Sequence, residues 1–376
     1  SLPMMMGMSV QAIYMLVDTA FVGKWVGGTA LAAMGYVFPF LFILMGITFG
    51  IGSGATTVIA QYIGADKKKN ADNTAEHVIF FGFIIFAVIL LFGFIYGEQF
   101  LQIQGANKVT TKTALEYFHI MVGGSFFMIM AVFFRSILSG EGDNIFPMKV
   151  LGAGTILNIV LDPIFIHFYQ LKGAAIATVI SQIIVFLIFA YAMVFKDHTY
   201  ITLSIKNFSF KPFIFKEIFR LGLPVSMSML IMSMGAFVFN IILNSSDAVA
   251  GYQTASRIEH LFFLPIISIA TSLVTLVGMF YGAKRYDLVK HIIKYGLTRS
   301  ILISILFSVF FFFCIDKIVS AFTDSPTIID ISVGYFRIMA FAYPFITLGM
   351  TSSRIMQGLG FANPMFILTL FRVVLI

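Results

Sequence analysis

The chain contains 376 residues, of which 59% are hydrophobic and only 11% are charged, and its mean hydropathy is +0.98. A water-soluble domain of this length cannot bury that much apolar surface. The net charge of +7 does not call for a nucleic-acid partner, because the basic residues lie between apolar segments. The composition therefore predicts an all-α polytopic membrane protein in contact with the lipid bilayer, and it argues against soluble enzymes and nucleic-acid-binding domains.

Apolar segments of roughly 20 or more residues, long enough to cross a bilayer as a helix, recur along the chain. In the first half they cover about residues 1–23, 36–62, 76–97, 114–139, 149–168 and 172–196. In the second half they cover about 216–244, 254–281, 288–315 and 329–358, and another begins near 364. The first half has six spans and the second has five when the chain stops, and the first residue is not Met. We therefore expect a fragment of a longer protein, without helix 12.

The two halves are copies of one unit. A shift of 218 positions aligns Thr57 with Thr275, Gly64 and Ala65 with Gly282 and Ala283, and Gly140 and Gly142 with Gly358 and Gly360. An even number of spans per unit makes the repeat parallel, with its pseudo-twofold axis along the membrane normal. We expect two six-helix bundles, an N-lobe at 1–196 and a C-lobe at 216–376, joined by a cytoplasmic linker at 197–215. A pathway between two such halves is typical of secondary transporters.

The basic residues predict the orientation of the chain in the membrane. Half of the 24 Lys and Arg fall in three connections on one side: Lys67, Lys68 and Lys69; Lys196, Lys206, Lys211, Lys216 and Arg220; and Lys284, Arg285, Lys290 and Lys294. By the positive-inside rule this side is cytoplasmic, and so is the N-terminus. We expect a multi-pass protein of a prokaryotic cell membrane.

The first span contains an acidic residue. Asp18 follows Leu16 and Val17 in an apolar segment, where a carboxylate costs about 2.5 to 3.5 kcal/mol on insertion scales. It should therefore face the protein interior. Gln11 and Tyr14 precede it by seven and four residues and lie on or near the same helical face. We expect this face to be polar and hydrated, and to line the cavity.

The fifth span carries a second polar stripe. Thr155, Asn158 and Asp162 recur at spacings of three and four, and Pro163 follows at once. The proline ring removes the hydrogen bond to the carbonyl of Ile159 and frees a backbone acceptor near the carboxylate. Such oxygen ligands suit Na⁺, or a proton shared between the carboxyl groups of Asp18 and Asp162. The alternative is that Asn158 and Asp162 only cap or bridge helices.

Together these residues resemble the multidrug and toxic compound extrusion (MATE) transporters, of the DinF-like branch. The resemblance covers the whole chain and rests on DTAFVGKWVGGTALAAMG from Asp18, IAQYIGA ending at Ala65, SGEGDNIFPM from Ser139, NIVLDPIFI from Asn158, GAAIATVISQ from Gly173, VGMFYGAKR from Val277 and GLGFANPM from Gly358. It implies two six-helix bundles that form a V, and export of drugs driven by Na⁺ or H⁺. It also implies a cation-coupling acid at Asp18, partnered in the N-lobe by Asn158, Asp162 and Thr178. We expect a monomeric transporter with no enzymatic activity and no cofactor.

The chain departs from some bacterial members of that family in its second half. Those members place coupling acids in the seventh and tenth helices, but no acidic residue lies between Leu221 and Asn244 or between Val333 and Leu359. This favours a cation site in the N-lobe. Arg257 and Glu259 begin the eighth span and are expected to have a structural or gating role. Arg354 lies near a cytoplasmic helix end, where we expect its side chain to extend to the interface.

Two alternative functions remain open from the sequence. A lipid-linked oligosaccharide flippase of the same superfamily would need a cationic central cavity for pyrophosphate, whereas the charges found within the spans are acidic and favour cationic amphipathic substrates. An intramembrane aspartyl protease is suggested by the GxGD pattern at 140–143. That pattern leads into Asn144 and Pro147 at a helix end, and its copy in the second half has no acid, so a turn explains it better.

Overall fold

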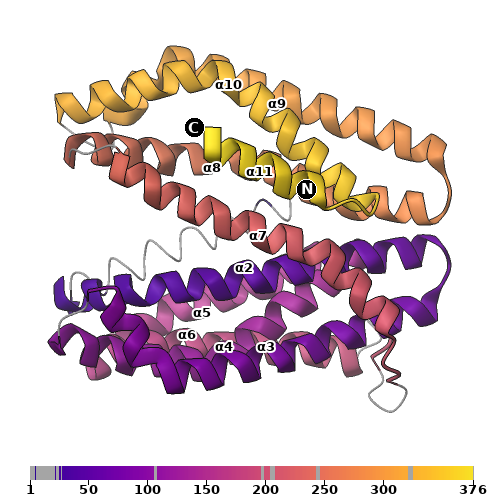
Figure 1. The fold of residues 1–376 in the computed structure, drawn as a ribbon, viewed down its shortest axis with the longest axis horizontal. Helices are drawn as coiled ribbons and strands as arrows, with labels where there is room; N and C mark the ends of the chain where they lie inside the picture. The colour runs from indigo at the N-terminus through magenta and orange to yellow at the C-terminus, as the bar shows by residue number, and fades with distance from the viewer. Residues whose placement is uncertain are drawn as a thin grey trace.

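The computed structural model describes residues 5, 22, 25–26, 28–105, 108–195, 199–203, 208–242, 246–320 and 325–375. Regular structure within these ranges is entirely helical. With the numbering of Figure 1, the helices are α2 (Gly28–Gly64), α3 (Lys68–Ile103), α4 (Lys108–Glu141), α5 (Ile145–Tyr169), α6 (Leu171–Phe195), α7 (Pro212–Ile242), α8 (Ser246–Gly282), α9 (Tyr286–Ser320), α10 (Pro326–Gly358) and α11 (Asn363–Leu375). The predicted span at 1–23 lies outside the described ranges, apart from two isolated residues.

Nine of the described helices are long and apolar enough to cross a membrane. Their outer faces keep large apolar side chains exposed, such as Phe313 at 75% and Leu306 at 68% on α9 and Leu91 at 62% on α3. Exposure on this scale is stable only where lipid rather than water covers the surface. The prediction of an all-α polytopic membrane protein is confirmed.

The helices extend beyond the predicted spans. α3, for example, runs from Lys68 to Ile103, whereas its apolar segment predicts only 76–97. Lys68 and Lys69 therefore belong to the first turn of α3, and Lys290 and Lys294 belong to α9, rather than to loops. The apolar pattern marks the part of a helix inside the hydrocarbon core, about 30 Å thick, while the backbone hydrogen bonds continue into the interface until a turn ends them.

The repeat is reproduced by the backbone. α2, α3, α4 and α5 begin at Gly28, Lys68, Lys108 and Ile145, and their counterparts α8, α9, α10 and α11 begin at Ser246, Tyr286, Pro326 and Asn363, each 218 residues later. The turns match as well: φ is positive at Asp66 (57°) and Lys284 (56°), and at Gly142 (94°) and Gly360 (97°). The predicted duplication is therefore present in the helices and in the turns between them.

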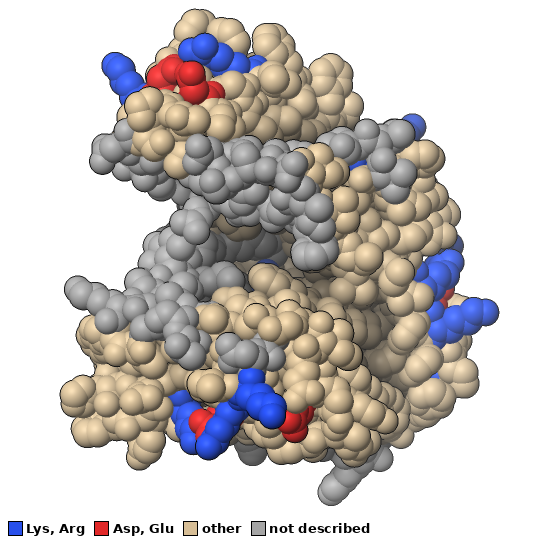
Figure 2. Space-filling view, turned by 60° about the vertical axis from the view of Figure 1, so that its left-hand side comes forward, with Lys and Arg blue, Asp and Glu red and all other residues tan. Residues whose placement is uncertain are grey.

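The helices form two bundles with α7 between them (Figure 1). In the first bundle, α2 packs on α3 and α4, and α6 packs on α4 and α5; in the second, α8, α9 and α10 pack on one another. α7 lies along α2 and also contacts α11, and α8 contacts α2. The bundles converge toward the turns at 65–67 and 283–285 and diverge toward the opposite helix ends (Figure 1). Figure 2 shows the molecule hollowed between them.

Small residues bring α2 and α7 close together. A Cβ atom built on Gly54 would lie 2.6 Å from the carbonyl oxygen of Ile218 and 2.7 Å from the backbone nitrogen of Gly222. One built on Gly222 would lie 2.8 Å from the Cα atom of Ile51. Only glycine permits this approach of two backbones, which is the usual function of small residues spaced four apart in membrane helices.

Candidate cation site and the contact between the bundles

Three of the predicted cation ligands lie together inside the first bundle. Asn158 and Asp162 lie one turn apart on α5, with only 3% and 0% of their surfaces exposed. The Nδ2 atom of Asn158 donates to Oδ1 of Asp162 at 3.2 Å and approaches Oγ1 of Thr178, on α6, at 3.5 Å. The structure thus brings a carboxylate, an amide and a hydroxyl together on two neighbouring helices.

The packing of α5 on α6 produces this arrangement. A Cβ atom on Gly154 of α5 would press against the side chain of Val185 on α6, so glycine allows the two helices to approach closely. Asn158 follows Gly154 by one turn and Asp162 follows by another, so the polar residues lie on the face that contacts α6. Pro163 lies within α5, and its missing N–H leaves the carbonyl of Ile159 without its helical donor.

These groups are hard oxygen ligands that suit Na⁺, and a buried carboxyl group can alternatively hold a proton. Oδ1 of Asn158 is buried, and no described residue donates a hydrogen bond to it. Thr155 is only partly buried and does not join these hydrogen bonds. Within the described ranges, no three His, Cys, Asp or Glu side chains cluster as ligands for a metal ion.

The remaining predicted residues of the N-lobe site, Gln11, Tyr14 and Asp18, lie outside the described residues. Whether Asp18 joins Asn158 and Asp162 at one site stays a prediction. The backbone of Arg257 belongs to α8, and its side chain is likewise outside the description.

Glu259 lies within the second bundle and contacts α10. Its Oε2 atom accepts a hydrogen bond from the hydroxyl of Tyr335 at 3.2 Å, and its Oε1 atom is buried. Aromatic side chains surround this pair. The rings of Tyr252 and Tyr335 pack edge to face, and Tyr343 belongs to the same cluster. Glu259 therefore links α8 to α10, in keeping with a structural role.

The two bundles are held together by hydrogen bonds that the sequence analysis did not predict. Nε2 of Gln357, on α10, donates to Oγ of Ser53, on α2, at 2.6 Å, and Gln357 has none of its surface exposed. The guanidinium of Arg354 donates to the same Oγ at 3.3 Å and to Oε1 of Gln357 at 3.0 Å. We expected the side chain of Arg354 to extend to the membrane–water interface. That expectation is wrong, because its guanidinium forms a hydrogen bond across the contact between the two bundles.

Two further hydrogen bonds continue this contact toward the helix ends. Nε2 of Gln61 donates to the carbonyl oxygen of Gly358 at 2.9 Å, and Oγ1 of Thr275 donates to that of Ser139 at 2.8 Å. At the ends themselves, α2 and α8 are too close for side chains: a Cβ on Gly64 would clash with the carbonyl of Met279, and one on Gly282 would clash with that of Gln61. The pseudo-twofold repeat relates these two close approaches to each other, because each pair of equivalent residues is separated by 218 positions.

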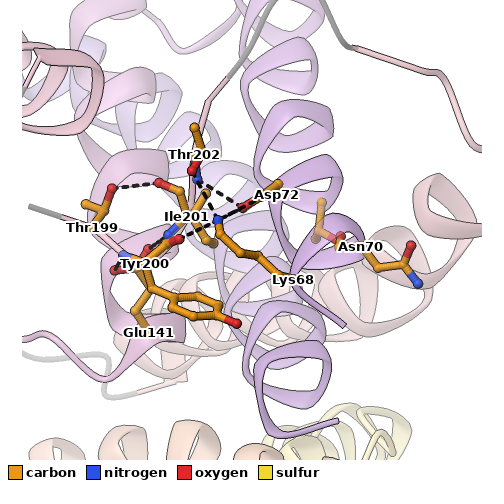
Figure 3. Close-up of polar contacts among 9 residues, drawn as sticks. Lys68, Asn70, Asp72, Glu141, Thr199, Tyr200, Ile201 and Thr202 are labelled. Carbon is orange, nitrogen blue, oxygen red and sulfur yellow. Dashed lines mark hydrogen bonds and ion pairs between the residues drawn. The ribbon is translucent and has the colours of Figure 1, made fainter. Parts of the chain in front are cut away.

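The segment after α6 is bound to the first bundle by two carboxylates (Figure 3). Glu141, at the end of α4, accepts from the backbone N–H groups of Ile201 at 2.8 Å and Tyr200 at 3.3 Å. Asp72, on α3, accepts from the N–H of Thr202 at 2.9 Å, and Lys68 bridges Asp72 and the carbonyl of Tyr200. Glu141 and Asp143 belong to the GxGD pattern, and Asp143 accepts from the N–H groups of Ile145 and Phe146 where α5 begins. The pattern therefore forms a turn, as expected.

Two bundles of long apolar helices, related by an internal repeat and with polar groups buried inside them, define a membrane transporter. The sequence profile of the MatE family matches residues 3–164 and 224–376, and the chain belongs to this family. Because the members of the family are transporters and not enzymes, the protease alternative is wrong.

The chain is similar to curated relatives and to solved structures along nearly its whole length. It is 28% identical to the "Probable multidrug resistance protein NorM" of Thermotoga maritima, over 98% of the chain and 81% of that protein. It is 23% identical to the "FAD transporter" of Shewanella oneidensis, over 91% and 77%. A solved structure described as the outward-facing conformation of a multidrug resistance MATE family transporter of the MOP superfamily matches with a TM-score of 0.93 and 31% identity, over 100% and 84%. The predicted MATE fold is confirmed.

Proposed function

We propose that the chain is a multidrug efflux antiporter that exports cationic amphipathic compounds in exchange for Na⁺ or H⁺. The observation that carries this proposal is the fully buried carboxylate of Asp162, which is hydrogen-bonded to Asn158 next to Thr178 inside the first bundle. An ionisable group at such a depth is costly and is usually functional. The name of the Thermotoga relative supports export of drugs.

We propose that Asp18, Asn158, Asp162 and Thr178 bind the coupling cation, with Gln11, Tyr14 and Thr155 nearer the substrate. In this mechanism the cation and the drug compete for the N-lobe: arrival of the cation neutralises the carboxylates, removes the attraction for a cationic drug, and rearranges α5 at Pro163. Aromatic and methionine side chains would then bind the apolar part of the drug.

The basic connections support the cytoplasmic assignment of the side on which the bundles are in contact, and of the N-terminus. With that orientation the hollow opens toward the outside, and the hydrogen bonds of Ser53 and Gln61 to α10 close the cytoplasmic side. Alternating access then requires these bonds to break. We further propose a monomer in a prokaryotic cell membrane, with lobes at 1–196 and 216–376 and a linker at 197–215.

The coupling ion determines which gradient drives export. The membrane potential contributes about 2.3 kcal/mol per charge per 100 mV. If one H⁺ or Na⁺ exchanges for one monovalent drug, the electrical contributions cancel, and the chemical gradient of the ion alone must drive export. A divalent drug exported against one cation would be opposed by the potential.

The test uses the purified full-length protein in liposomes loaded with a fluorescent cationic dye. A Na⁺ gradient and a pH gradient are imposed in separate experiments, and FAD replaces the dye in a parallel pair. Dye movement under one gradient supports the antiporter and identifies its ion. Movement of FAD alone would indicate an anionic substrate and contradict the predicted cationic one. Movement of neither, together with translocation of a pyrophosphate-linked lipid, would favour the flippase.

A further inference from the structure

A cavity lies at the end of the first bundle where α2, α3 and α7 meet. It encloses about 370 Å³. Its polar wall consists of Gln61 and Tyr62 near the end of α2, Lys67 and Asn70 at the start of α3, and Lys211 and Glu217 around the start of α7. Its apolar lining includes Val58 and Ile214. The residues proposed for transport do not line it.

The cavity carries unneutralised positive charge. Lys67 is exposed, and Nζ of Lys211 donates only to the amide oxygen of Asn70, at 3.3 Å. Among the described residues, neither lysine has a carboxylate within ion-pair distance. Glu217 is the acidic residue of the wall, and it is already paired with Arg220 at 3.0 Å. Two lysines and an amide therefore converge on a space whose single carboxylate is already paired, which suits an anion.

The repeat provides an internal comparison. The counterpart of Lys67, 218 residues later, is Arg285, which forms an ion pair with Asp287 at 3.0 Å. The counterpart of Asp287 is Lys69, so the first bundle has no equivalent ion pair. The duplicated turn therefore carries a cation in both bundles. Arg285 has an acidic partner, whereas Lys67, which lines the cavity, has none among the described residues.

The position of the cavity favours a lipid over a dissolved anion. It lies beside the last residues of the apolar span that ends at Gly64 and next to the first turn of α3. The ends of membrane-spanning segments lie close to the polar headgroups of a bilayer. Phe213, on the rim, has 64% of its surface exposed, so an apolar face adjoins the charged wall. Basic pockets between membrane helices are known to bind anionic lipid headgroups.

We propose that this cavity binds the phosphate of an anionic phospholipid headgroup. The phosphate contacts Lys67 and Lys211, and the acyl chains lie along the apolar surface near Phe213. A bound headgroup holds the start of α7 against the end of α2 and the start of α3. Because Gln61 lines the cavity and bonds to Gly358 of the other bundle, the lipid also favours contact between the bundles on this side. This inference needs only the membrane placement of the chain, and not its transport activity.

The test measures retention of phosphatidylglycerol by native mass spectrometry of the full-length protein. The double variant Lys67→Gln/Lys211→Gln is expected to lose lipid adducts about tenfold or more relative to the unsubstituted protein. The control Lys290→Gln/Lys294→Gln removes the same charge from exposed positions on α9 and should retain them, as should Arg285→Gln. Thermal unfolding in lipid-free detergent reports whether each variant is folded.

Three results would overturn the proposal. One is equal retention by the cavity variant and the unsubstituted protein. Another is equal loss in the α9 control, which would reduce the effect to bulk charge. The third comes from a separate arm with inorganic phosphate: if phosphate alone protects Lys67 and Lys211 from amine labelling as well as phosphatidylglycerol in nanodiscs does, the site takes a dissolved anion. Protection by phosphatidylglycerol and not by phosphate or phosphatidylcholine supports the lipid.

Discussion

Single residues of the candidate site differ in how well the sequence predicts them. Asn158 and Asp162 are found by their spacing on one face of an apolar helix, and both are buried as that pattern requires. Thr178 is found only through the family resemblance, because one threonine on another helix has no local signal. Thr155 shares the stripe but is only partly buried, since a face defined at 100° per residue is wider than the contact with α6.

Asp162→Asn is expected to reduce ion-driven export while leaving the fold intact, because the amide keeps the size of the side chain but cannot change charge. Coupling free energies of about 1–3 kcal/mol correspond to a loss of roughly 5- to 150-fold, measured as dye efflux from liposomes under the driving gradient. His167→Asn, at an exposed position of the same helix and outside the proposed site, is the matched control. Normal gradient dependence in the Asn variant would remove Asp162 from the mechanism.

Whole elements are predicted less accurately at their ends than in their middles. The apolar pattern locates each described helix, yet α3 and α9 extend past it at both ends. Outside the hydrocarbon core a helix continues through polar residues, and hydropathy does not distinguish these helical residues from polar loop residues. Gly54 allows α2 to pack closely on α7, but the sequence does not identify α7 as the partner helix.

Gly54→Ala tests the packing of α2 on α7. The added methyl group would meet the backbone of Ile218 and Gly222, which cannot move aside as a side chain can. Overpacking of this kind costs about 1–3 kcal/mol, so the thermal unfolding temperature in detergent should fall. Gly46→Ala is the matched control, because its Cβ would lie 3.6 Å or more from its neighbours. Equal stability of the two variants would contradict the close backbone approach.

Glu141→Gln tests the attachment of the segment that follows α6. The neutral amide keeps one acceptor oxygen for two N–H groups, at Tyr200 and Ile201, and loses the charge that strengthens both bonds. Hydrogen exchange of residues 199–203 should therefore accelerate, while exchange within α4 stays slow. Asp143→Asn, in the same turn, should leave that segment unchanged. Unaltered protection in the Gln variant would show that Asp72 alone holds the segment.

At the scale of the whole molecule, the conformation depends on a small set of contacts near the ends of α2, α4, α8 and α10. Several are polar and join residues about 300 positions apart, such as Ser53 and Gln357. A transporter must populate states in which these hydrogen bonds are made and states in which they are broken. Each bond shifts the equilibrium between those states by the difference in its free energy between them.

Gln357→Ala is expected to shift the population away from the observed conformation. The bond to Ser53 disappears, and interhelical hydrogen bonds in membrane proteins contribute on average about 0.6 kcal/mol, or roughly a threefold change in population. Spin labels at Ile103 and Thr327, at the diverging ends of the two bundles, would report it as a larger fraction of short distances in a Cys314→Ser background. Ser233→Ala, which loses only a bond within α7, should leave the distances unchanged.

The sequence alone determines the class of this protein, because the length and number of its apolar segments and the 218-residue repeat can be recognised without knowledge of any tertiary contact. It also determines the stripe of Asn158 and Asp162, since helical spacing fixes which residues share a face. The tertiary structure alone decides which helices meet. The bonds from Ser53 and Gln61 to α10, the attachment of residues 200–202 to Glu141 and Asp72, and the cavity at Lys67 and Lys211 all join residues distant in sequence. No periodicity encodes such pairings, because they depend on how two bundles pack against each other.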